Sequence, residues 1–282
     1  MKPIRDAIAA LGTDLGPDIL GQCRALFDAE QVALAAAAPV TQADIAYGPD
    51  DRHRLDLYRP QGDAPAPILL FVHGGGFLKG DKGSADAWPN ANVGRMAAQA
   101  GSLGVVINYR LAPDHGWPAG AEDVAAVVAW LKDHAAEHGG APDRIVLMGT
   151  SAGAVHVAGY LKLAGSGAIR AAVLLSGLYG YTPLDQRDTL YYGDPALYPE
   201  RMPLEAIAST DLPLLIACAE FDPPRFQAEF LSLLQDRLPR HGAMPRAFIQ
   251  SGHNHYSMAL HLGTADRRLA NEICAFVRET TA

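Results

Sequence analysis

The chain has 282 residues, of which 49% are hydrophobic, so it is long and apolar enough to bury a substantial core. Its formal net charge of −8 argues against a nucleic-acid partner, because such binding needs lysines and arginines that neutralise phosphates. The sequence has no run of about 18 consecutive apolar residues, so no membrane span is predicted.

Residues 1–40 are predicted to be helical, with Pro17 near a helix start and Pro39 as a stop. Because this segment precedes the sheet, it is either a cap over a functional site or a helix that only packs against the domain. From Asp44 to Arg59 the apolar residues alternate with polar ones around a Gly-Pro-Asp-Asp turn. This pattern predicts an antiparallel hairpin at one edge of a sheet.

Short apolar runs then alternate with helical segments, a pattern that indicates a parallel sheet with helices on both faces. We therefore predict one α/β domain over residues 1–282, with a mostly parallel, doubly wound sheet of the eight-stranded type. The predicted strands are 68–72, 105–109, 144–148, 171–175, 213–219 and 245–249. The predicted helices are 92–100, 118–138, the segment after Ser151, 225–238 and 264–279.

Residues 177–210 interrupt this alternation with five tyrosines and four prolines. Tyrosine combines apolar area with a hydroxyl, which suits the wall of a substrate pocket. We predict that this insertion is a second cap segment, although it would also suit a packed surface loop.

Ser151 lies in Gly149-Thr150-Ser151-Ala152-Gly153, between a predicted strand and a predicted helix. So tight a turn strains the backbone of its middle residue and requires small neighbours, and it leaves the serine hydroxyl exposed at the edge of the sheet. Ser151 is therefore the candidate nucleophile. The other interpretation is that Ser151 only caps the following helix.

A serine nucleophile needs a base, and the base needs a group that orients it. Asp222 and a histidine pair, His253 and His255, follow later strands, so the topology brings them to the same edge of the sheet as Ser151. Asp222 is the candidate acid in preference to Glu220, which lies nearer the strand. His255 is the preferred base, and His253 remains the alternative. A metal site at His253-Asn254-His255 would need further ligands from elsewhere, so no metal is predicted.

The glycine run Gly74-Gly75-Gly76 follows another strand end and can turn its N–H groups toward an anion. The N–H groups of Gly75, Gly76 and Ala152 are the candidate oxyanion hole, and His73 is expected to brace the loop.

Three cysteines, Cys23, Cys218 and Cys274, cannot all pair and lack metal-ligand spacing. Asp6 and Asp14 interrupt the first segment, which therefore does not match a signal peptide. These features predict reduced thiols in a cytoplasmic protein. The oligomeric state stays open, a homo-oligomer included.

Taken together, four motifs resemble the hormone-sensitive-lipase-like carboxylesterases of the α/β-hydrolase fold. They are the segments 73–77, 109–113 and 149–153 and the Asp222-Pro223 step. The resemblance implies an acyl-serine esterase without metal or organic cofactor, acting on small short-acyl esters. Carried over by position, it implies Ser151 as nucleophile, Asp222 as acid, His255 as base, and Gly75, Gly76 and Ala152 as oxyanion donors.

The chain departs from that family at two places, with Pro224-Arg225 after the acid and Tyr256 after the base. An arylformamidase or amidase would use the same residues, and the shared motifs do not separate it from an esterase. A third hypothesis is a ligand-binding protein that kept the fold and lost turnover.

Overall fold

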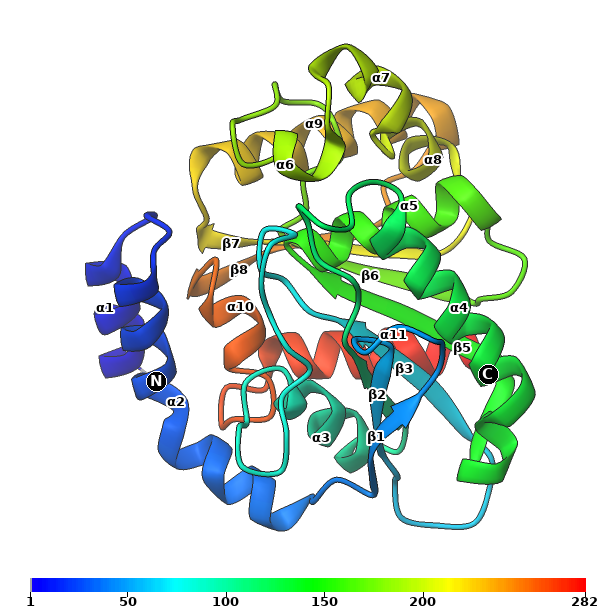
Figure 1. Ribbon diagram of the computed structural model, residues 1–282. Helices are drawn as coiled ribbons and strands as arrows, with labels where there is room; N and C mark the ends of the chain where they lie inside the picture. The colour runs from blue at the N-terminus through cyan, green and yellow to red at the C-terminus, as the bar shows by residue number, and fades with distance from the viewer. Residues whose placement is uncertain (1) are drawn as a thin grey trace.

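An eight-stranded sheet organises the computed structural model, which describes residues 2–282 (Figure 1). The strand order is β1-β2-β4-β3-β5-β6-β7-β8; β2 is antiparallel to both β1 and β4, and all other neighbours are parallel. The strands are β1 Gln42–Ala46, β2 Arg54–Tyr58, β3 Ala66–Val72, β4 Leu103–Ile107, β5 Gly140–Thr150, β6 Ala171–Leu175, β7 Leu214–Phe221 and β8 Arg246–Asn254. The predicted fold class and the hairpin at the sheet edge are confirmed.

Helices cover both faces of this sheet. Side chains of α4, α5, α8 and α9 pack on one face, and those of α3, α10 and α11 pack on the other. The helices are α1 Lys2–Leu11, α2 Pro17–Ala37, α3 Ala91–Gln99, α4 Ala119–His134, α5 Ala152–Ala164, α6 Thr189–Tyr192, α7 Tyr198–Arg201, α8 Leu204–Ser209, α9 Pro224–His241, α10 Ser257–Leu260 and α11 Arg268–Thr281, with short 3₁₀ turns η1 Ala135–His138 and η2 Pro195–Leu197.

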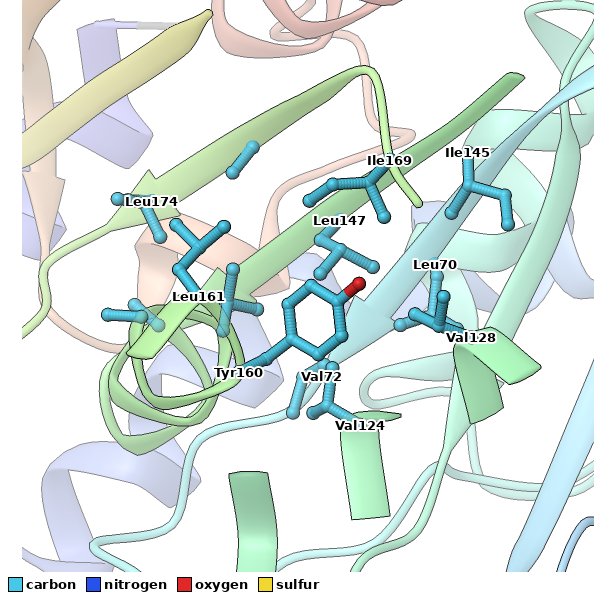
Figure 2. Packing of buried hydrophobic residues seen from close by; sticks show 14 of the residues in the cluster. Leu70, Val72, Val124, Val128, Ile145, Leu147, Tyr160, Leu161, Ile169 and Leu174 are labelled. Atoms are coloured by element: carbon cyan, nitrogen blue, oxygen red, sulfur yellow. The ribbon is translucent and has the colours of Figure 1, made fainter. Parts of the chain in front are cut away.

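Between the sheet and helices α4 and α5, aliphatic side chains surround the buried ring of Tyr160 (Figure 2). Leu70, Leu147 and Leu174 come from three adjacent parallel strands and contribute to this cluster. Burying a side chain of this size contributes on the order of 1.5–3 kcal/mol. The cluster fixes α5 on the sheet, and with it the turn that precedes α5.

Several elements end at residues other than those predicted. The last strand continues to Asn254 rather than residue 249, because β7 extends to Phe221 and pairs with Asn254. Strand β5 begins at Gly140, which pairs with Ala66, instead of at residue 144. Strand β4 lies two residues earlier than predicted. The last helix begins at Arg268 instead of residue 264, because the Thr264 hydroxyl donates to the His261 carbonyl and closes the preceding turn.

The N-terminal helices α1 and α2 lie beside β8 and α10, on the left of Figure 1. Their contacts are largely apolar, through Ile8, Cys23 and Phe27 against Trp88 and Leu260. The helical prediction for residues 1–40 is confirmed as far as the described residues go; Met1 lies outside them. Within residues 2–282, no helix combines the length and the apolar character needed to cross a membrane.

Candidate active site

Ser151 lies in the turn between β5 and α5 with φ 53° and ψ −123°, a conformation that is strained for a residue with a side chain. The turn is too tight for larger neighbours. A Cβ on Gly153 would lie 2.0 Å from the Val72 carbonyl oxygen, and one on Gly149 would lie 2.4 Å from the Gly153 backbone. The Ser151 side chain makes no capping hydrogen bond to α5. The helix-cap interpretation is therefore wrong, and the hydroxyl is free for another partner.

That partner is His255, whose Nε2 lies 3.0 Å from Ser151 Oγ. On the other side of the ring, Nδ1 lies 2.7 Å from Asp222 Oδ1. Asp222 is fully buried and His255 nearly so. When Nδ1 donates its proton to Asp222, Nε2 is left to accept the proton of the Ser151 hydroxyl.

Asp222 has two further partners, which fix its second carboxylate oxygen. Ser176 Oγ donates to Oδ2 at 2.6 Å, and the Ala219 N–H donates to the same atom at 2.7 Å. Ser176 is buried, has a positive φ of 48°, and follows β6 directly. Ser176 is not among the residues predicted from the sequence. Its position at the end of a parallel strand, on the same sheet edge as Ser151, was the signal that could have identified it.

Glu220 and His253, the alternatives for the acid and the base, both lie in other hydrogen-bond networks. Glu220 accepts hydrogen bonds from the Gly252 N–H, Ser251 and Arg5, and these hold the pKa of its carboxyl below its usual value. His253 contacts Asp266 and Ser257, and burial lowers the pKa of its imidazole. The structure therefore brings His255 and Asp222 to Ser151, and it brings neither His253 nor Glu220 there.

The glycine loop runs beside Ser151, and its conformation requires glycine. Gly75 has φ 137°, and a Cβ on it would lie 1.7 Å from the Lys79 carbonyl oxygen. Within residues 2–282, the N–H groups of Gly75 and Gly76 have no acceptor, and the N–H of Ala152, at the first position of α5, has none either. All three residues line the same cavity as Ser151, and three such donors suit an oxygen that gains negative charge.

His73 and the segment after β4 brace this loop. The His73 ring is buried, lies 4.4 Å from the Tyr109 ring, and places Nδ1 2.6 Å from the Gly74 carbonyl. Burial lowers the pKa of His73 to about 4, so the ring is neutral at pH 7. The Tyr109 hydroxyl donates to the His73 carbonyl, and the Ala112 N–H donates to the carbonyl of Phe77.

Above Ser151 lies a cavity of about 440 Å³. Leu15 and Leu20 from the N-terminal segment line it, together with Leu178 from the insertion. Tyr256, one of the two departures noted in the sequence, also lines it, with its ring 5.9 Å from that of His255. The cavity wall thus joins segments that are far apart in the sequence.

The insertion 177–210 is held in place by helix α9. Glu229 is fully buried and accepts hydrogen bonds from the N–H groups of Tyr179, Gly180 and Thr182. Arg225 donates to Thr182 and forms ion pairs with Asp185 and Asp188. The Arg225 departure is thereby explained, because its guanidinium fixes the start of the insertion.

The insertion also contacts the glycine loop, since the Tyr191 ring stacks on Phe77 with centroids 4.3 Å apart. This contact is apolar and buried. It couples the position of the insertion to that of the loop.

Within residues 2–282, one cluster contains three side chains of the kinds that bind metals, namely His253, His261 and Asp266. Their potential ligand atoms lie within 4.8 Å of one another. The two imidazoles stack at 3.8 Å, and Arg268 forms an ion pair with the Asp266 carboxylate. Asn254 and His255 do not belong to this group. The arrangement balances its own charge, as expected for a hydrogen-bonded packing cluster.

Comparison with known proteins gives consistent matches. A family model described as alpha/beta hydrolase fold matches residues 69–209, which is half of the chain. Esterase LipQ of Mycobacterium tuberculosis is 28% identical over 267 residues, which cover 83% of this chain and 61% of that protein. Carboxylesterase NlhH of the same species is 42% identical over 87 residues, covering 31% of this chain and 26% of that protein.

Among solved structures, an esterase of Pyrobaculum calidifontis aligns with a TM-score of 0.71 at 23% identity, covering 100% of this chain and 98% of that one. This likeness concerns the fold. The chain spans about three fifths of LipQ and about a quarter of NlhH.

Proposed function

The chain belongs to the α/β-hydrolase fold family, in its hormone-sensitive-lipase-like branch, and we propose that it is a serine hydrolase of carboxylic esters. The observation that carries this proposal is the continuous hydrogen-bonded chain from Ser151 through His255 to Asp222, with the Ser151 hydroxyl facing the cavity. Curated relatives that are named esterase and carboxylesterase support it.

In the first half-reaction, His255 Nε2 takes the Ser151 proton while Oγ attacks the ester carbonyl carbon. The carbonyl oxygen becomes an oxyanion and is stabilised by the N–H groups of Gly75, Gly76 and Ala152. The tetrahedral intermediate collapses as the protonated His255 donates its proton to the departing alcohol oxygen. Asp222 holds the imidazole in the required orientation and stabilises its positive charge.

In the second half-reaction, His255 takes a proton from water, which attacks the acyl-serine. The carboxylic acid leaves and the proton returns to Ser151. Each oxyanion donor contributes on the order of 100- to 1,000-fold to the rate. No step in this sequence requires a metal or an organic cofactor.

The two cap assignments belong to the same proposal. Residues 1–40 and 177–210 act as two cap segments on one domain of residues 1–282, because side chains of both segments line the cavity above Ser151. A cavity of about 440 Å³ has room for a small ester with a short acyl chain. The cytoplasmic location stays a prediction, supported by three free cysteines whose thiol pKa values are raised by burial.

The test is hydrolysis of p-nitrophenyl esters from acetate to dodecanoate by the wild type and by Ser151→Ala. We expect turnover that peaks at short chains and a loss of about a million-fold in the variant. Ser166→Ala, in the loop after α5 and away from the cavity, is the matched control. A fluorophosphonate probe should label the wild type and the control at Ser151, and should not label Ser151→Ala.

N-formylkynurenine is assayed alongside the esters. Turnover of the formamide without turnover of any ester would replace the proposal with an arylformamidase. Ester turnover that survives in Ser151→Ala would remove Ser151 as the nucleophile.

A further inference from the structure

The cavity above Ser151 has an excess of cationic side chains, and these take no part in the proposed steps of ester hydrolysis. Arg24, Lys79 and Arg187 all line it, and all three are exposed. Within residues 2–282, none of the three has a carboxylate within 4.0 Å. Of the three carboxylates in the lining, Asp185 and Asp188 pair with Arg225, and Asp14 has no cationic partner among the side chains that the structure describes. The unpaired groups therefore sum to a local positive charge on a chain whose net charge is −8.

Arg187 is unpaired although acidic residues flank it in the sequence. Asp185 and Asp188 both turn to Arg225, whose Nη1 and Nη2 lie 2.9 Å and 2.5 Å from their carboxylate oxygens. One guanidinium thus neutralises much of the negative charge beside Arg187. Arg225 thereby leaves the guanidinium of Arg187 available to a ligand.

Arg187 also lies next to the glycine loop. A Cβ placed on Gly76 would lie 3.2 Å from Arg187 Cδ and 3.7 Å from its Nη1. The cationic head is therefore beside a proposed oxyanion donor and not at a distant rim. Lys79 belongs to the same loop region, since its carbonyl oxygen packs against Gly75.

From this arrangement we propose that the preferred substrate is an ester that carries a carboxylate, with Arg187 as the specificity-determining residue. A guanidinium offers two parallel N–H donors that match a carboxylate, and Arg24 and Lys79 add long-range attraction. The apolar wall, which includes Leu15, Leu20 and Leu178, accommodates the hydrocarbon part. This inference rests on the proposed ester hydrolysis and names its substrate class.

The experiment compares kcat/KM for matched ester pairs at low ionic strength. On the acyl side, the pair is monomethyl adipate and methyl hexanoate, followed by proton release. On the alcohol side, it is para-carboxyphenyl butyrate and phenyl butyrate. In each pair the measured quantity is the ratio of the charged to the neutral ester. Comparing this ratio between variants cancels the intrinsic reactivity of each ester.

In the wild type we expect the ratio to exceed one for at least one pair. Arg187→Gln should lower that ratio roughly tenfold. Arg187→Lys should lower it less, because lysine keeps the positive charge but lacks the two parallel N–H donors of the guanidinium. Added salt should lower the wild-type ratio. Arg278→Gln, an exposed arginine of α11 outside the cavity lining, makes the same change in net charge and should leave the ratio unchanged.

A ratio that is the same in Arg187→Gln and in the wild type for both pairs would overturn this inference while leaving the ester hydrolase in place. Absence of turnover of all four esters, together with no fluorophosphonate labelling, would overturn the proposed function and this inference with it. The pair that responds to Arg187→Gln identifies whether the carboxylate belongs to the acyl part or to the alcohol.

Discussion

His255 and His253 are separated by one residue, yet they belong to two networks of different character. The Ser151 network comprises Ser151, His255, Asp222 and Ser176, and one end of it is a serine hydroxyl at a cavity. The His253 network comprises His253, His261, Ser257, Asp266 and Arg268, and it ends on the guanidinium of Arg268.

The difference shows that buried imidazoles and carboxylates are not sufficient for a reactive site. In the Ser151 network a proton can pass from the serine hydroxyl to the His255 ring, while the Asp222 carboxylate stabilises the positive charge on that ring. In the His253 network the Asp266 carboxylate is already paired with Arg268, which holds its pKa well below the usual value. We therefore expect the first network to determine activity and the second to determine stability.

The largest expected effect comes from replacing each of the two histidines in turn. His255→Ala should lower kcat by about a million-fold, since removal of the base disables the whole network. His253→Gln should lower kcat by less than about tenfold, because its ring does not touch Ser151 or Asp222. Steady-state kinetics of both variants, with circular dichroism to verify folding, make the comparison. Equal losses in the two variants would contradict the assignment of the base to His255.

The next largest effect is a loss of stability at acidic pH, which depends on the buried histidines. Burial lowers the pKa of His73 to about 4, that of His156 to about 3 and that of His261 to about 3. A histidine whose folded-state pKa is depressed stabilises the fold above its unfolded pKa of about 6.5, and this stability is lost as the pH falls toward the folded value. At pH 5 each such histidine lowers the free energy of unfolding by about 2 kcal/mol, because only the unfolded chain takes up the proton.

The thermal midpoint should therefore fall between pH 7.5 and pH 5. His261→Asn should reduce this fall, whereas His115→Gln, which changes a partly exposed histidine, should leave it as in the wild type. A midpoint that does not change over this range would show that the buried rings become protonated in the folded chain.

A smaller effect is expected when the second network is broken on its own. His253→Gln should lower the free energy of unfolding by about 2 kcal/mol, because the ring leaves Ser257 and Asp266 with fewer partners. Urea titration measures this loss. A stability equal to that of the wild type would show that the His253 network contributes nothing beyond packing.

The smallest effect is expected at Ser176. Ser176→Ala removes one of the hydrogen bonds to Asp222 Oδ2 but leaves the bond from the Ala219 N–H. We expect kcat to fall roughly tenfold, with a shift in the acidic limb of the pH–rate profile, because Asp222 positions His255 less well. Ser176→Thr keeps a hydroxyl and should recover part of the rate. A kcat loss without any change in the pH profile would point to a purely structural role.

The sequence identified the strand ends from which these side chains project. The apolar run before Ser151 and the small residues around it predict the strand, the turn and the helix, and the structure has all three. Asp222 and the histidine pair could be placed at the same sheet edge because parallel strands end on one side. The bounds of β8 were less predictable, since its last residues are polar and are held as a strand by pairing with β7.

The choice between His253 and His255 could not be made from the residues alone. Both follow the same apolar run, and the direction of each side chain depends on how far β8 continues. The roles of Ser176 and Arg225 were not predicted for a related reason. Asp222, the partner of Ser176, lies 46 residues away in the sequence, and Asp185 and Asp188, the partners of Arg225, lie 40 and 37 residues away, so only the folded chain brings them together.

The sequence by itself determined the sheet, the strained serine turn and the glycine loop, because local spacing and side-chain size control these features. Only the tertiary structure decided which histidine reaches Ser151, which serine holds Asp222 and which arginine remains unpaired at the cavity. Those outcomes depend on distances between segments that are remote in sequence, and hydrogen bonds and ion pairs form only where packing brings their partners within about 3 Å.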